Sequence, residues 1–209
     1  MFPQLARKRI GGNSRVGCVL ALDFKHKDGD SFMSDDCYGH LCTNYGSKWQ
    51  LDGRYFDGVG NYVECSEVSI PDYTPWTVES SLYVQSNWVN FLGDYTNDGL
   101  NLILKAGEGT VGLQRQSTSM LIQCPIGASL NTWMHIVWSV DASRNLYLYL
   151  NGELKTTVAV GQSTALRVKY IARRNTELDY SWYKGLIGGV RINNSADYIP
   201  RILSRSIGG

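Results

Sequence analysis

The sequence predicts an all-β protein, a two-sheet antiparallel sandwich of the jelly-roll type. Short segments in which apolar and polar residues alternate recur about every 8–12 residues, with Asp, Asn and Gly between them, as in sandwich proteins. The 209 residues include 22 Gly, 13 Tyr and 6 Trp but only 4 Met, a composition typical of strands joined by tight turns. No helical pattern of useful length precedes Ser195–Leu203.

The clearest strand pattern lies between Thr132 and Glu153. Alternation through Trp133–Asp141 and again through Leu146–Leu150 predicts strands with one buried face, joined by a polar loop. Asn151-Gly152 fits a type I′ turn, because both residues tolerate positive φ. A register slip of one residue would exchange the two faces of these strands. We expect the central strands to include Trp133, Trp138, Leu148, Leu150 and either Ile136 or His135.

Further strands are predicted on both sides of this segment. In chain order they are Gly17–Phe24, Tyr55–Glu64 (two strands around Asp57-Gly58), Pro75–Gln85, Trp88–Gly93, Leu100–Lys105, Thr110–Gln116, Met120–Cys124, Thr156–Val160, Ala165–Ala172 and Gly185–Asn193. Lys25–Lys48 is expected to be a long polar loop. Since no repeat or low-complexity linker divides the chain, we expect one domain over 17–199, with an N-terminal arm at 1–16 and a C-terminal tail at 200–209.

The bulk composition excludes several classes of partner. A net charge of +1, with 19% charged residues, provides no field for capturing nucleic acid. No apolar run is long enough to span a membrane. The N-terminal sequence MFPQLARKRIGG has basic residues but no apolar stretch after them, so no signal peptide is predicted. We expect synthesis in a cytoplasm and a final location in a virion or on an extracellular surface.

The five cysteines are an odd number, so at least one has no partner within the chain. Cys18, Cys65 and Cys124 lie in apolar, strand-like runs and are expected to be buried thiols. Cys37 and Cys42 flank a short loop segment. They fit a local disulfide, half of a zinc site together with His40, or two ordinary thiols; one Cys-x4-Cys pair cannot supply four zinc ligands.

Seven segments, in this order, resemble the laminin-G-like branch of the concanavalin A-like lectin/glucanase superfamily. They are ALDF at 21–24, LDGRYFDGVGNYVE at 51–64, WTVESSLYV at 76–84, LNTWMHIVWSVD at 130–141, LYLYLNGEL at 146–154, YIARR at 170–174 and GLIGGVRI at 185–192. The resemblance covers residues 17–200 and implies a jelly roll of two antiparallel sheets. The strand spacing indicates the same architecture independently.

The chain departs from the family pattern at two places. Gly188-Gly189 stand where the last strand of the family usually carries an acidic pair, and Gly60-Asn61 stand where two Asp are common. The resemblance associates such an Asp with a structural calcium, so these changes argue against that ion and we expect no cofactor. The nearby loop acids fit either an unrelated calcium site or a solvated acidic loop; they are Asp28, Asp30, Asp35 and Asp36.

The sequence gives no sign of catalysis. Glycoside hydrolases of the superfamily use a strand motif of the form E-x-D-x-(x)-E, and this chain has no such run. Glu177 and Asp179 have the first spacing but lack a third acid. His26, His40 and His135 lie far apart without a recognisable nucleophile motif, and a structural role is expected for His135. We therefore expect a protein that is not an enzyme.

Aromatic residues near Asn and Asp provide a candidate glycan site. An exposed ring binds the apolar face of a sugar while the polar side chains bind its hydroxyls. The candidates are Trp88, Tyr95, Asn97, Asp98, Tyr180, Trp182 and Tyr183. The alternative is that these aromatic residues belong to the core or to a subunit interface.

The N-terminal arm is the candidate for binding a protein partner. It has four cations and no carboxylate, and too few apolar residues to fold alone. Phe2, Leu5 and Ile10 can anchor in a groove, and cations can pair with an acidic surface; these cations are Arg7, Lys8, Arg9 and Arg15.

Two extensions on one domain favour a non-enzymatic structural protein of a large assembly, such as a virion decoration, cement or tail component. Its partners would be capsid or tail proteins or further copies of this chain. The alternative is an adhesion module that recognises cell-surface carbohydrate.

We expect a variant lacking residues 2–12 to keep the sandwich folded but to assemble more weakly, because the anchoring side chains are lost while the core is kept. Sedimentation of the full and shortened proteins, at equal concentration and salt, measures this. Equal assembly by both proteins would remove the main support for the assembly role.

Overall fold

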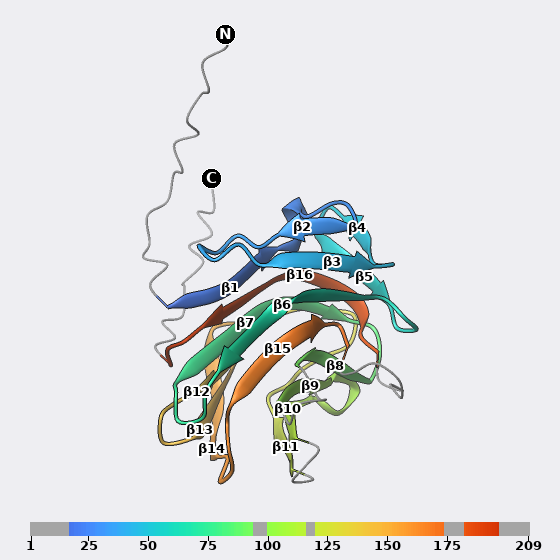
Figure 1. Ribbon diagram of the computed structural model, residues 1–209. Coiled ribbons are helices and arrows are strands. Elements are labelled where there is room, and N and C mark those ends of the chain that lie inside the picture. The colour runs from blue at the N-terminus through green and yellow to red at the C-terminus, as the bar shows by residue number, and fades with distance from the viewer. Residues whose placement is uncertain (1–16, 94–99, 116–119, 174–181, 197–209) are drawn as a thin grey trace, which may run out of the picture.

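The computed structural model describes residues 17–93, 100–115, 120–173 and 182–196, which form two antiparallel sheets packed face to face (Figure 1). Sheet A contains β1 (Cys18–Asp23), β4 (Lys48–Gln50), β5 (Gly53–Asp57), β7 (Trp76–Val84), β12 (Trp133–Val140), β13 (Asn145–Leu150), β14 (Glu153–Ala159) and β16 (Lys184–Asn193). Sheet B contains β2 (Ser31–Met33), β3 (Leu41–Tyr45), β6 (Tyr62–Ile70), β8 (Trp88–Gly93), β9 (Asn101–Lys105), β10 (Thr110–Arg115), β11 (Met120–Pro125) and β15 (Leu166–Ile171). The predicted all-β sandwich is confirmed.

The order of sheet A is β14-β13-β12-β7-β16-β5-β4, with β1 also paired to β16, and that of sheet B is β11-β10-β9-β8-β15-β6-β3-β2. The described residues also form two 3-10 turns, η1 (Phe24–His26) and η2 (Ala106–Glu108). In the described part of the chain, no helix has the length and apolar character needed to cross a membrane.

The segment from Lys25 to Lys48 differs from its prediction as one polar loop. It contains the last two residues of η1 and all of β2 and β3, and β4 begins at its last residue. These strands have three to five residues, too few for alternation to distinguish them from a loop. The Asn-Gly turn is as predicted: Asn151 and Gly152 have φ of 52° and 87° and connect β13 to β14.

Alternation along β7 and β12 sets which face of sheet A is buried. Val78 and Leu82 of β7 and Ile136 and Trp138 of β12 are fully buried between the sheets. Trp138 stacks on Phe91 of sheet B, with ring centroids 5.7 Å apart and planes 18° apart. The register therefore places Ile136 in the core, and His135 on the outer face of sheet A.

Strand β16 has one partner along one edge and two along the other. It pairs with β7 through Gly185–Asn193. Its other edge pairs with β5 through Lys184–Ile187 and then with β1 from Gly189 onward, so the change of partner falls at Gly188. A register shift lies at the same point of the ladder with β7. Two strands can thus end against one strand at a glycine pair.

The chain enters and leaves the described domain at adjoining positions. The amide of Asn194 donates to the carbonyl of Gly17 over 2.8 Å. Beyond it, Thr77 and Ser139 donate to the carbonyls of Ser195 and Ala196 over 2.7 and 3.2 Å. The described chain therefore begins and ends beside sheet A.

Asp72 ties three connections together at one end of the sandwich. Its carboxylate accepts hydrogen bonds from the amide of Thr164, over 2.9 Å, and from the guanidinium of Arg144, which also lies over the Tyr73 ring. Trp76 donates its indole N–H to the carbonyl of Thr164 over 2.8 Å. Burial raises the pKa of Asp72. The hydrogen bonds that its carboxylate accepts from Thr164 and Arg144 outweigh burial and hold this pKa at about 2, below the ordinary 3.8.

We expect Asp72→Asn to lower the free energy of unfolding at neutral pH, and the difference from the wild type to shrink on acidification. Because the folded-state pKa lies below the unfolded value, the carboxylate stabilises the fold fully above pH 3.8 and loses this effect as the pH falls toward about 2. Urea unfolding of both proteins from pH 6 downward measures this. Asp52→Asn, at an exposed turn position, is the control. A difference that did not change with pH would contradict the assignment.

Candidate functional site

A hollow of about 660 Å³ lies on the outer face of sheet A, where β1, β7, β12 and β16 adjoin. Its lining includes side chains that point away from the core. They are Asp23, Lys25, His26, Asp35, Glu79, Ser81, His135 and Arg191, with Gly188 and Gly189 among them. We call this hollow the glycine groove.

Gly188 and Gly189 keep the glycine groove open. A Cβ atom on Gly188 would lie 3.3 Å from the Cβ of Ser81 and 3.5 Å from Cζ3 of Trp133. A Cβ atom on Gly189 would lie 2.8 Å from the carbonyl oxygen of Leu22, so a side chain there would displace β1. The absence of side chains at the change of strand partner therefore makes the hollow.

The carboxylate of Glu79, between an imidazole and a guanidinium, forms the centre of the glycine groove. Glu79 Oε2 lies 3.6 Å from His135 Nε2, and Glu79 Oε1 lies 3.6 Å from Arg191 Nε. The strand register sets this arrangement, since Arg191 is opposite Glu79 and His135 is opposite Ser81. All three side chains are partly exposed, so these contacts orient the side chains but contribute little to the stability of the fold.

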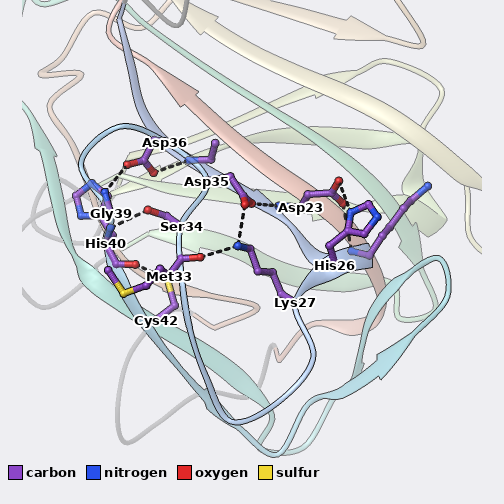
Figure 2. Close-up of polar contacts among 12 residues, drawn as sticks. Asp23, His26, Lys27, Met33, Ser34, Asp35, Asp36, Gly39, His40 and Cys42 are labelled. Carbon is purple, nitrogen blue, oxygen red and sulfur yellow. Dashed lines mark hydrogen bonds and ion pairs between the residues drawn. The ribbon is translucent and has the colours of Figure 1, made fainter. Parts of the chain in front are cut away.

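Residues of η1 and β1 form one wall of the glycine groove, and Figure 2 shows the hydrogen bonds that hold them. Asp23 accepts from the amide of Lys25, over 3.2 Å, and lies 3.0 Å from Nδ1 of His26. Asp35 accepts from the amide of Asp23 over 2.9 Å and pairs with Lys27 Nζ at 2.7 Å. The side chains on this wall are therefore held by local contacts.

Asp36 fastens the following loop to β1, as Figure 2 also shows. Its carboxylate accepts from the amides of Ala21, Tyr38 and Gly39 over 2.9 to 3.0 Å. Burial raises the pKa of Asp36, but the hydrogen bonds from Ser34 and from these amides lower it below its usual value. These hydrogen bonds therefore favour the ionised form of Asp36.

The four acids considered for calcium contact groups of the protein itself. Asp28 and Asp30 lie near the buried guanidinium of Arg54: burial lowers the pKa of Arg54, and their charges raise it. Asp35 and Asp36 make the contacts given above. Within the described residues, no group of three or more His, Cys, Asp or Glu is arranged to hold a metal ion.

An exposed aromatic side chain lies beside the glycine groove. Trp133, next to Gly188, is 38% exposed, and its ring centroid is 5.8 Å from that of Tyr83. Alternation places Trp133 on the same face of β12 as His135. One surface thus presents an aromatic ring, a carboxylate, an imidazole and a guanidinium.

The aromatic residues predicted for glycan binding do not gather at this surface. Trp88 is 39% exposed on β8 of sheet B, with Lys105 Nζ 4.2 Å from its ring centroid. Trp182 is half-buried beside Tyr62 and has Arg173 over its ring. Tyr183 is fully buried in the core and donates to the carbonyl of Leu186, so its ring has no free face for a sugar.

The remaining predicted site residues lie outside the described residues. They are Tyr95, Asn97, Asp98 and Tyr180 of the glycan candidates, and Phe2, Leu5, Arg7, Lys8, Arg9, Ile10 and Arg15 of the arm.

The glycine groove was not predicted from the sequence. Alternation assigns Glu79, Ser81 and His135 to outer faces, but it does not indicate which distant strands pair. The Gly188-Gly189 pair could have indicated an open position on the sheet, but it was interpreted only as the loss of two acidic residues.

Solved structures with a similar fold include the botulinum neurotoxin serotype D binding domain and a Trypanosoma rangeli sialidase in complex with sialic acid. The first has 12% identity and a TM-score of 0.61, and the match covers 86% of this chain and 49% of that chain. The second has 16% identity and a TM-score of 0.60, with 86% and 31% covered. The chain thus spans about half of the toxin chain and a third of the sialidase, and the likeness shows the fold alone.

Among curated proteins, none matches this sequence. A family model described as the concanavalin A-like lectin/glucanases superfamily matches residues 57–196, which include β6 to β16 and every strand of the glycine groove except β1. The chain therefore belongs to the concanavalin A-like lectin/glucanase superfamily.

Proposed function

We propose that this protein is a carbohydrate-binding module without enzymatic activity, and that the glycine groove is its sugar site. The observation that carries the proposal is the position of Trp133 beside the groove that contains Glu79, His135 and Arg191. The ring offers a flat apolar surface to the C–H face of a pyranose. The three polar side chains offer acceptors and donors to its hydroxyl groups.

The balance of charge favours a sugar bound through its hydroxyl groups. Two acids of the groove have a cationic neighbour, Glu79 beside Arg191 and Asp35 beside Lys27, and Asp23 lies beside the imidazole of His26. No single sign of charge dominates the surface, so we infer a neutral oligosaccharide ligand. The open shape of the hollow fits a chain segment better than one enclosed ring.

The same pairing favours binding over hydrolysis. Glycoside hydrolysis needs two carboxylates on opposite sides of the bond that breaks. In the groove, Glu79 lies between His135 and Arg191, while Asp23 and Asp35 fasten η1 and β1. We infer that Glu79 positions the sugar, and that Asp23 and Asp35 hold the wall of the groove in place.

The similar structures support a role in recognition. One is titled as a receptor binding domain of botulinum neurotoxin D, and another is a sialidase in complex with sialic acid. We infer for this chain a binding domain that acts at an extracellular surface. The role in a large assembly, as a virion decoration or tail component, stays a prediction, because its arm lies outside the described residues.

We expect Trp133→Ala to weaken sugar binding about fivefold, since one stacking contact contributes on the order of 1 kcal/mol. A neutral glycan array, followed by calorimetry with the best ligand, measures this. Trp88→Ala is the matched control, because Trp88 is equally exposed but lies on sheet B. An array without any ligand, or a loss with Trp88→Ala instead, would contradict the proposed site.

We expect Glu79→Gln to weaken binding of the same ligand by a similar factor while the protein stays folded, because one charged acceptor becomes an amide. The same calorimetry and a melting curve measure both effects. Neither protein should release reducing ends from the ligand; release by the wild type that Glu79→Gln abolishes would show that the groove is catalytic.

A further inference from the structure

Two of the five cysteines lie opposite each other across β3 and β6. Cys42 and Cys65 are direct partners in the antiparallel register. Their side chains are 0% and 2% exposed, and their Sγ atoms are 2.9 Å apart. Cys37, the other candidate partner of Cys42, is exposed. The fold thus brings together two thiols that lie 23 residues apart in the sequence.

The backbone positions of this pair suit a covalent bond. Directly opposed residues of antiparallel strands have Cα atoms about 4.5–5.5 Å apart. Disulfides span Cα separations of about 4.4–6.8 Å, so the strands need not move for a bond to close. The thiol sulfurs already contact each other. We propose that Cys42 and Cys65 form a cross-strand disulfide in an oxidising environment, in place of the Cys37–Cys42 bridge that the sequence left open.

A small disulfide such as oxidised glutathione is the oxidant in this proposal. The thiolate of one cysteine attacks it and releases one glutathione thiol, which leaves a mixed disulfide on the protein. The thiolate of the second cysteine then attacks the protein sulfur of that mixed disulfide and releases the second glutathione thiol. Two protein S–H bonds are lost, one S–S bond forms, and the two electrons and two protons pass to the released thiols.

The reaction belongs to folding rather than to the folded state. The hydrogen bond with Cys42 and burial raise the pKa of Cys65 well above its ordinary value, so thiolate is scarce once the strands have packed. Before β3 closes on β6, both thiols are accessible to the oxidant.

The bond would fasten the outermost hairpin of sheet B. Among the described strands, β2 is the edge of that sheet and pairs with β3, and β3 pairs with β6 over Cys42–Tyr45. The loop of this hairpin carries Asp35 and Asp36, which hold β1 beside the glycine groove. The bond would thus limit movement of the groove wall, although its formation does not depend on sugar binding.

The test compares wild-type protein refolded in a mixture of reduced and oxidised glutathione with the same protein refolded under reductant. After alkylation and digestion, mass spectrometry should find the Cys42 peptide linked to the Cys65 peptide only in the oxidised sample. The melting temperature of that sample should be higher by about 5–10 °C. The Cys37→Ser variant should still show the linked peptides and the higher melting temperature. The Cys65→Ser variant should show neither.

Alkylation of all five cysteines after oxidised refolding would overturn the proposal, and so would a Cys42 peptide linked to Cys37. Both readouts come from the wild type, so they remain decisive if Cys65→Ser fails to fold.

Discussion

The structure depends on the way in which β16 is shared between neighbours. It pairs with β7 along one edge, while β5 and β1 succeed each other along the other edge. Two strands that end against one strand need space for their last residues, and Gly188-Gly189 provide it. The glycine pair thus completes sheet A and also leaves the hollow on its outer face. A larger residue at either position would have to displace a neighbour.

Short polar contacts, rather than apolar packing, support the wall of the glycine groove. Asp23, Asp35 and Asp36 accept hydrogen bonds from backbone amides of η1, β1 and the following loop. Two of these amides, those of Ala21 and Asp23, belong to β1, and the carboxylates satisfy them. Acidic residues that are candidates for an ion site in the sequence can instead accept hydrogen bonds from their own backbone. The cation partner of Asp35 is Lys27, from the same segment.

The fold was predictable because its long strands alternate regularly. Trp76–Val84 and Trp133–Val140 were identified within a residue or two, and the buried Trp138 followed from the pattern. The short strands β2 and β4 were not identifiable, since three residues hold too little alternation. Alternation could not decide between the two alternatives for Tyr183, a sugar contact or a core residue; the structure places it in the core, while its neighbour Trp182 is half-buried. Predicting the groove would have required knowing that Glu79 pairs with Arg191. Alternation along one strand does not show which distant strand lies next to it.

The adjoining entry and exit of the chain, joined by the bond between Gly17 and Asn194, have a consequence for how this fold is used. A unit whose two ends meet can be inserted into a surface loop of another protein without stretching that loop. Both connections would then leave from the side of sheet A, on whose outer face the carbonyls of Ser195 and Ala196 are bound. The sandwich could therefore be carried as an insert, and the position of the insertion would set the direction in which the outer face of sheet A points.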